Sequence, residues 1–233
     1  MGAAHFPPYT QRPERGSDSG LLQQLADALN AVQHDYRFVL VPTSIPRRFR
    51  DLHNGRTDLA IFENPAWGWQ DIPHHTVDMG LEDAELFVAR RAPGRTERYF
   101  DHLAGKRLAL FNGYHYAFAQ FNADPHYLAR VHAASLTYSH ESNLYMVERG
   151  RADVALVTRS YLTDFLARHP ASAQALLVSE RVDQVYRHYA ILRPQAPISA
   201  EAFAALLERL RSNGELQRIF APYQIAVTPT PGA

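Results

Sequence analysis

The chain has 233 residues, of which 46% are hydrophobic and 21% are charged, as in a globular protein with one large or two small domains. Its 24 Lys and Arg residues balance its 24 Asp and Glu residues, so no net charge favours binding to nucleic acid or to an anionic membrane. The absence of cysteine excludes disulfides, thiol catalysis and thiolate metal sites.

Hydrophobic periodicity predicts that helices and strands alternate along the chain. In chain order, we expect a helix from Ser19 or Gly20 to Val32, a strand at 36–41, a short helix at 46–54, strands at 59–62, 86–89 and 108–111, a helix at 116–121, a strand at 131–136, a helix at 143–149, a strand at 154–157, a helix at 161–168, a strand at 189–192 and a last helix that begins at Ser199 and runs through Leu210. This alternation indicates an α/β fold with mostly parallel sheets. Residues 228–233, with two prolines, are expected to form a loose tail.

One pattern occurs twice in the chain. Residues 55–62 and 150–157 share Gly-Arg-x-Asp followed by four apolar residues, the second of which is Ala. Gly55 and Gly150 each follow an amphipathic segment, at the position where a helix end favours a positive φ. The apolar run after each Asp is typical of a buried parallel strand. The repeat therefore predicts two lobes that share a helix–Gly–strand unit.

Several short segments occur in a recognisable order: HFPPYT at 5–10, GLL at 20–22, RFRDL at 48–52, GRTD at 55–58, LAGKRLA at 103–109, GY at 113–114, RGRAD at 149–153 and NGELQRIFAPY at 213–223. Together they resemble family 3 extracellular solute-binding proteins over nearly the whole chain. The resemblance implies the type II periplasmic-binding-protein fold, with two α/β lobes that each contain a mostly parallel sheet flanked by helices. Lobe 1 would comprise residues 1–89 and 190–227, and lobe 2 residues 90–189, with hinge strands near 87–91 and 187–192. A full strand usually precedes the FPPY motif in this family, and we expect a short or trimmed one here.

The resemblance also implies a function. We expect a protein that is not an enzyme, binds a small polar, aromatic or cationic solute between its lobes, closes around it, and delivers it to the permease of an ABC transporter. It would be a monomer in the bacterial periplasm, with no cofactor, no metal ion and no nucleic-acid partner. Residues 1–5 lack the charged and apolar regions of a signal peptide, so we expect an exported form to carry a leader that is not in this sequence.

In lobe 1, two loops supply candidate ligand-binding residues, because ligands of open α/β sheets bind at the carboxyl ends of strands. The loop after the strand at 59–62 contains Glu63, Asn64, Trp67 and Trp69. The indole rings can stack on a ring or a cation, and Glu63 can pair with an ammonium group. Tyr9 lies on a loop edge fixed by two prolines, and the resemblance implies ligand contact there. A core position for either Trp, and a solvated rim position for Glu63, stay open.

In lobe 2, the candidates are Asn112, Gly113, Tyr114 and Tyr116, at a strand–turn–helix junction. Free N–H groups at a helix start suit a ligand carboxylate or another acceptor, although the two tyrosines can instead pack in the core. Ser142 and Thr158 lie in two further strand-end loops. Ser142 can alternatively cap the helix that follows it.

One departure from the family bears on the ligand. Amino-acid binders commonly carry an Arg soon after the lobe 1 strand, where it clamps the α-carboxylate, but residues 64–70 contain no Arg or Lys. Arg47 and Arg48 lie one element earlier and could reach the cleft, although we favour an exposed helix face for them. The sequence therefore does not predict a standard α-amino acid as the ligand.

Two other functions stay open. The fold also serves as the ligand-sensing input domain of membrane receptors, and it occurs in enzymes such as cyclohexadienyl dehydratase. In an enzyme, Glu63, His115 or Glu141 could act as an acid or a base. The 12 histidines are scattered along the chain, which indicates surface histidines and not a metal site.

Overall fold

A computed structural model describes residues 1–13 and 20–228, which form two compact units. Unit 1 comprises Met1–Asp83 and Tyr186–Ala233, and unit 2 comprises Ala84–Val185. The chain passes between them twice, within the long strands β4 (His75–Arg90) and β8 (Leu176–Leu192). The lobe boundaries expected from the sequence fall inside these same two strands.

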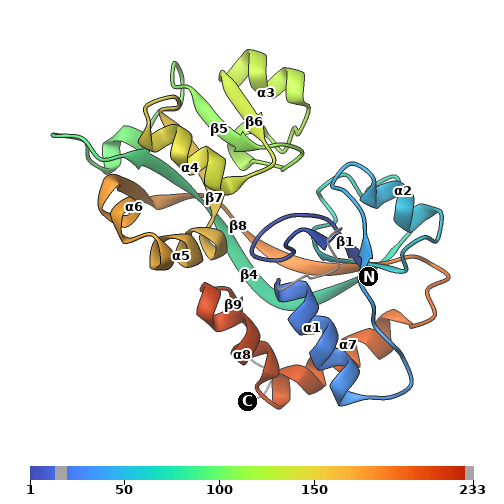
Figure 1. Cartoon of the computed structure of the whole chain (residues 1–233). Helices are drawn as coiled ribbons and strands as arrows, with labels where there is room; N and C mark the ends of the chain where they lie inside the picture. The colour runs from blue at the N-terminus through green and yellow to red at the C-terminus, as the bar shows by residue number, and fades with distance from the viewer. Residues whose placement is uncertain (14–19, 229–233) are drawn as a thin grey trace. The chain divides into compact units, whose positions relative to one another are not determined.

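Unit 1 is built on a mixed sheet. Strand β1 (Gly2–Ala3) pairs in parallel with β2 (Val41–Pro42) and β3 (Leu59–Glu63), and β3 pairs antiparallel with β8. Strand β9 (Ala226–Val227) pairs antiparallel with β4. Helices α1 (Leu21–Val32), α7 (Ala200–Ser212) and α8 (Glu215–Phe220) pack together (Figure 1), and α2 (Arg48–His53) packs on β1 and β3.

The core of unit 1 follows from helical periodicity. In α1, Leu21, Leu25 and Leu29 lie on one face and are fully buried, because positions i, i+4 and i+8 share a helix face. In α7, the Ser199 hydroxyl accepts a hydrogen bond from the Ala202 N–H at 3.1 Å, which is the expected N-cap. Both predicted helices are therefore confirmed over their described residues, which do not include Ser19.

Unit 2 has β5 (Leu108–Phe111) at its centre, paired in parallel with β6 (Ala134–Thr137) and β7 (Val154–Thr158). Strand β7 also pairs antiparallel with β4. Helix α4 (His140–Glu148) packs on all three parallel strands, and α3 (Pro125–His132) packs on β6. Helix α5 (Arg159–Arg168) packs on β7 and on α6 (Pro170–Ala175).

The repeated sequence pattern forms the same local structure in each unit. Gly55 and Gly150 have φ angles of 73° and 69°, and each donates its N–H to the carbonyl three residues earlier, at 3.1 and 3.0 Å. Each unit therefore contains a helix that ends at a left-handed glycine and leads into a buried strand, α2–β3 in unit 1 and α4–β7 in unit 2. The predicted helix–Gly–strand unit is confirmed.

Some predicted elements are wrong. The strand expected at 36–41 is limited to β2, because the Asn30 side chain bonds both the N–H and the carbonyl of Phe38, at 2.7 and 2.8 Å. The strand expected at 131–136 begins only at β6, after α3. Asp124 caps α3 by accepting from the Tyr127 N–H at 2.7 Å, and Pro125 occupies its first turn.

Two further points concern the C-terminal tail and the capacity of the helices to span a membrane. The expected tail lies outside the described residues from 229 onward, and the Thr228 N–H donates to the Gly80 carbonyl at 2.8 Å. Across the described ranges, 1–13 and 20–228, none of the helices has the length and apolar character needed to span a bilayer.

Candidate functional site

In unit 1, Tyr9 lies at the centre of a buried polar network. Its hydroxyl donates to Asp83 Oδ2 at 2.6 Å and lies 2.8 Å from His188 Nε2. A tyrosine hydroxyl has one proton, so donation to Asp83 leaves the oxygen to accept from His188 Nε2–H. Burial lowers the pKa of His188 to about 3, so the imidazole that donates this bond is neutral near pH 7.

The backbone beside this network is strained. Phe62, near the carboxyl end of β3, has a φ of 63°, in the left-handed region that a bulky residue rarely adopts. The β3–β8 register shifts at the same place, between Ala60 and Glu63. The Phe62 ring lies 4.8 Å from the Tyr9 ring and 5.5 Å from the His188 ring. Such strain clusters at binding and active sites, so this end of β3 is the candidate site of unit 1.

The loop after β3 adds Asn64 and Trp67 to the candidate site. Asn64 Oδ1 accepts from the Ala66 N–H at 3.0 Å, which fixes the turn, and Asn64 Nδ2 donates to the Arg187 carbonyl at 3.3 Å. The Trp67 ring meets the Tyr186 ring edge-on at 5.2 Å, and Tyr186 lies 5.3 Å from His188. Tyr9 and Trp67 therefore belong to one aromatic cluster.

Glu63 and Trp69 lie in a different environment. Glu63 Oε1 pairs with Arg48 Nε at 2.8 Å, and Glu63 Oε2 accepts from Trp69 Nε1 at 2.9 Å. Trp69 is fully buried against Phe49, with ring centroids 4.6 Å apart. Both side chains hold the loop onto the core. The expectation that Arg48 lies on an exposed helix face is wrong, because its side chain is only 10% exposed; Arg47 is exposed.

In unit 2, the predicted turn follows β5. Gly113 has a φ of 79°, and Asn112 Nδ2 donates to the Tyr138 hydroxyl at 2.6 Å. Tyr114 and Tyr116 are buried, with ring centroids 5.0 Å apart. The Tyr116 hydroxyl accepts from the Phe111 N–H at 2.8 Å, so this residue holds the turn to the end of β5.

The expectation that free N–H groups at this turn bind a ligand anion is wrong. The helix expected at 116–121 is a single 3-10 turn, η3 (Ala117–Ala119). The N–H groups of Ala117 and Phe118 donate to the Asp183 carboxylate at 2.7 and 2.9 Å. Burial raises the pKa of Asp183 above its ordinary value, against the effect of these two bonds. The protein's own carboxylate therefore occupies the position that a ligand anion was expected to take.

Thr158 ends β7, and Ser142 lies in the first turn of α4, after β6. Thr158 is fully buried and caps α5, where its hydroxyl accepts from the Tyr161 N–H at 3.2 Å. Ser142 is exposed, and its N–H donates to the Ser139 hydroxyl at 3.1 Å, so Ser139 is the cap of α4. Thr158 keeps a structural role, and the Ser142 side chain faces solvent.

The sequence interpretation missed several buried polar residues at these edges. Asp83 and His188 lie on β4 and β8 in unit 1. Glu85 on β4 lies opposite Thr158 in the β4–β7 register, and burial together with the Glu85 charge raises the pKa of Tyr116. Asn143, which the sequence offered only as a weaker candidate or a helix cap, is buried in α4, and its Oδ1 accepts from the Thr137 hydroxyl at 2.7 Å. The alternation of acidic and apolar residues at 83–86 could have revealed β4 and its two buried acids, Asp83 and Glu85.

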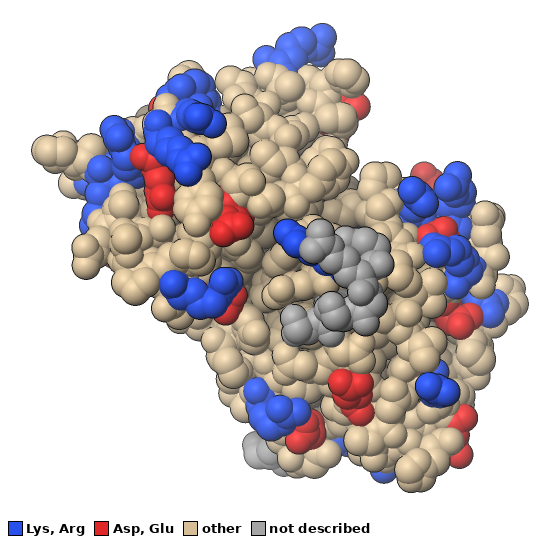
Figure 2. All heavy atoms as spheres, in the orientation of Figure 1, with Lys and Arg blue, Asp and Glu red and all other residues tan. Residues whose placement is uncertain are grey.

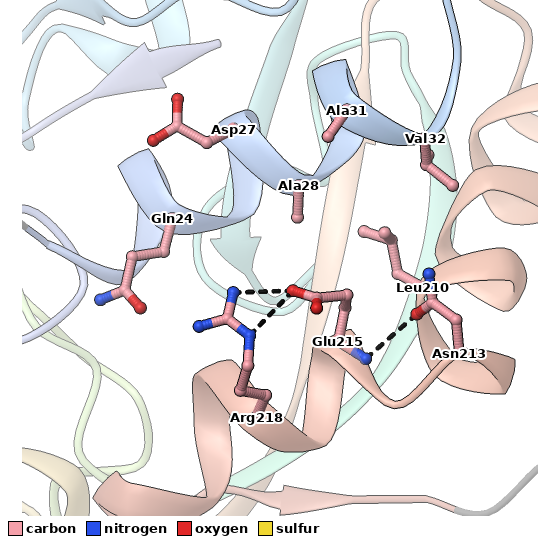
Figure 3. Close-up of a pocket in the computed structure, with 9 residues that line it drawn as sticks. All are labelled: Gln24, Asp27, Ala28, Ala31, Val32, Leu210, Asn213, Glu215 and Arg218. Atoms are coloured by element: carbon pink, nitrogen blue, oxygen red, sulfur yellow. Dashed lines mark hydrogen bonds and ion pairs between the residues drawn. The ribbon is translucent and has the colours of Figure 1, made fainter.

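A separate groove lies on the outer helices of unit 1. Figure 3 shows it between α1, α7 and α8. Its volume is about 480 Å³. Ala28, Ala31 and Leu210 line it together with the Glu215–Arg218 ion pair. None of the predicted site residues lines this groove. Among residues 1–13 and 20–228, no group of three His, Asp or Glu side chains could hold a metal ion.

Comparison with known proteins identifies the fold. No family model and no curated protein matches the sequence. Among solved structures, a histidine kinase sensor domain with similarity to periplasmic binding proteins has 20% identity and a TM-score of 0.71, covering 98% of this chain and 96% of that one. A mutant of ArgBP from T. maritima has 17% identity and a TM-score of 0.69, covering 96% and 93%. The chain has the two-lobe periplasmic-binding-protein fold.

A further neighbour with this fold is the ancestral amino acid-binding protein AncCDT-1, a precursor of cyclohexadienyl dehydratase. It has 14% identity and a TM-score of 0.68, covering 95% of this chain and 92% of that one. The predicted resemblance is thus confirmed for the periplasmic-binding-protein fold. At these identities, the neighbours do not extend it to a ligand or a reaction.

Proposed function

We propose that this protein binds a small-molecule ligand with groups from both units and does not act as an enzyme. The observation that supports this best is the combination of the periplasmic-binding-protein fold with the aromatic and polar side chains at the ends of its strands. In each unit, aromatic and polar side chains gather at the carboxyl ends of the central strands, where open α/β sheets bind ligands. Proteins of the same fold include an arginine-bound ArgBP and a GluR0 ligand-binding core in complex with L-glutamate.

The ligand in this proposal is a small polar, aromatic or cationic solute. Tyr9, Asn64 and Trp67 are the unit 1 residues that we assign to it, and Asn112, Gly113, Tyr114 and Ser142 are those of unit 2. Thr158 is not among them, because its buried hydroxyl caps α5. Glu63, Trp69 and Tyr116 support these loops from the core. Arg48 Nε already forms an ion pair with Glu63 Oε1 at 2.8 Å. This argues against Arg48 as a clamp for a ligand carboxylate, and therefore against a standard α-amino acid as the ligand.

Binding would act through the two strands that join the units. β4 and β8 are the hinge strands of the proposal, and a ligand stabilises a closed arrangement only by its greater affinity for that arrangement. We further propose that the protein is a periplasmic monomer that delivers its ligand to an ABC transporter permease.

Two alternatives follow from particular neighbours. A ligand-sensing input domain is favoured by the 0.71 TM-score to a histidine kinase sensor domain. A transmembrane helix and a signalling domain in the full-length protein would decide for it. A dehydratase-like enzyme is raised by the neighbour AncCDT-1, and turnover of prephenate by the purified protein would decide for that.

Native mass spectrometry of the purified protein tests the proposal. We expect a complex with one small molecule, because closed binding proteins retain their ligand, and this molecule should be released on unfolding. It should rebind to protein that has been unfolded and refolded without it, and should raise the melting temperature. The proposal fails if the protein carries no small molecule and no compound in a metabolite panel raises its melting temperature.

A further inference from the structure

Unit 2 carries a concentration of positive charge that the neutral chain as a whole does not predict. Residues 90–107, which connect β4 to β5, contain six Arg and Lys residues against two Asp and Glu residues. Figure 1 shows part of this connection projecting from the body of unit 2, and Figure 2 shows Lys and Arg side chains gathered over that end.

Two of the basic side chains contact the same aromatic ring, that of Tyr99. The Arg95 guanidinium carbon lies 4.0 Å from the centroid of the Tyr99 ring, and Lys106 Nζ lies 4.8 Å from it. Both contacts are cation–π interactions, which hold the charges in place. We call Arg90, Arg91, Arg95, Arg98, Tyr99, Lys106 and Arg107 the Tyr99 patch.

Two of the acids near the patch, Glu97 and Asp153, are already engaged, whereas Asp101 is exposed. Glu97 Oε1 accepts from the N–H groups of Glu180 and Arg181, both at 3.1 Å. Asp153 accepts two parallel bonds from Arg107, Nε to Oδ2 and Nη2 to Oδ1, both at 3.0 Å. Arg90, Arg91 and Arg98 are exposed, and within the described part of the chain their side chains form no ion pair. The patch therefore presents several cations that the protein does not neutralise.

We propose that the Tyr99 patch docks an acidic segment of a partner protein. Five of its six cations are Arg, whose planar fork matches carboxylates in pairs, and Arg107 already holds Asp153 in that way. The large exposed hydrophobic residues of the described chain, Val39, Phe121, Val131, Tyr138 and Val185, all lie outside residues 90–107, so the patch has no apolar anchor for a lipid surface. This inference is independent of the proposed ligand site, because it uses none of that site's residues.

The test uses the full chain and a fluorescein-labelled peptide of about ten residues in which Glu alternates with Ser. Fluorescence anisotropy should detect binding that weakens as salt is raised, because salt screens exposed charges. Replacing Arg95, Arg98 and Lys106 with Glu should weaken binding at least about tenfold, since each exposed pair contributes a fraction of that loss. Arg90→Glu with Arg91→Glu, which leaves the contacts of Tyr99 intact, should also weaken it.

The matched control replaces Arg37, Arg47 and Arg50 with Glu. These are three exposed residues of unit 1, and the control should bind the peptide as the parent does. The proposal is overturned if the parent does not bind the peptide, or if this control loses as much affinity as the patch variants. Tighter binding to phosphatidylglycerol-containing vesicles or to duplex DNA than to the peptide would also overturn it. Thermal melting of each variant shows that a loss of binding is not a loss of fold.

Discussion

Trp67 and Trp69 are two residues apart but differ in what they contact. Trp69 is fully buried, packs on Phe49 and donates its indole N–H to Glu63. Trp67 packs edge-on against Tyr186 in the cluster that contains Tyr9. We therefore assign Trp69 to the stability of the loop and Trp67 to ligand contact.

Replacement of each tryptophan separates these roles. Trp69→Ala should lower the free energy of unfolding by about 3–5 kcal/mol, the usual cost of a large buried ring, as measured by urea denaturation. Trp67→Ala should leave the protein folded and weaken binding of the ligand released from the purified protein by about tenfold, since cation–π or stacking contacts contribute about 1–2 kcal/mol. Trp67→Phe, which keeps a ring, should lose less. Unchanged affinity in Trp67→Ala would remove this residue from the site.

The Tyr9–Asp83–His188 network predicts a loss of stability in acid. The pKa of His188 is about 3 in the folded protein, against an ordinary value of 6.5. Between these values the unfolded chain binds more protons, so the free energy of unfolding falls as the pH is lowered from about 6.5 toward 3. The contribution is at most roughly 1.4 kcal/mol per pH unit for this one group, and above about pH 6.5 it is constant.

Urea denaturation at about pH 7 and about pH 4.5 measures this effect. His188→Gln should lose less stability between the two pH values than the parent, because it removes the group whose proton binding differs between the folded and unfolded states. His34→Gln, at an exposed histidine, should behave as the parent does. An equal loss of unfolding free energy in all three proteins would show that protonation of His188 does not cause the loss of stability in acid.

At the scale of elements, α1, α7 and the central strands β3, β5 and β7 could be predicted, because each buries an uninterrupted apolar face. The long strands β4 and β8 were predicted only at their apolar ends, 86–89 and 189–192. Asp83 and Glu85 lie within β4 as fully buried acids, and partners from distant segments, such as the Tyr9 hydroxyl for Asp83, make that burial possible. A single sequence does not show such partners, which is also why Asp83 and His188 were missed as site residues.

The glycines of the repeated unit give a prediction at the same scale. Gly150 has a φ of 69°, and a Cβ there would meet no atom within 4 Å, so the cost of a side chain comes from the backbone alone. Gly150→Ala should therefore lower the free energy of unfolding by about 1 kcal/mol. Gly150→Asn should recover part of this, because Asn tolerates the left-handed region. A neutral Gly150→Ala in urea denaturation would contradict the strain argument.

For the whole molecule, the proposed hinge makes a prediction about size in solution. Protein loaded with its ligand should have a smaller radius of gyration by small-angle X-ray scattering than protein stripped by unfolding and refolding, because the closed arrangement buries surface that the open one exposes. Identical scattering profiles, with binding confirmed by mass spectrometry on the same samples, would contradict hinge closure while leaving ligand binding in place.

Unit 1 consists of two chain segments separated by unit 2, and this has a consequence for synthesis on the ribosome. Helix α1 packs on α7 and α8, whose residues come after the whole of unit 2 in the chain. Residues 84–185 emerge as one continuous stretch and can fold while unit 1 still lacks its last helices. At ordinary translation rates, the apolar face of α1, with Leu21, Leu25 and Leu29, must wait on the order of ten seconds for its packing partners. During that interval it is a ready target for chaperones that recognise exposed apolar helices.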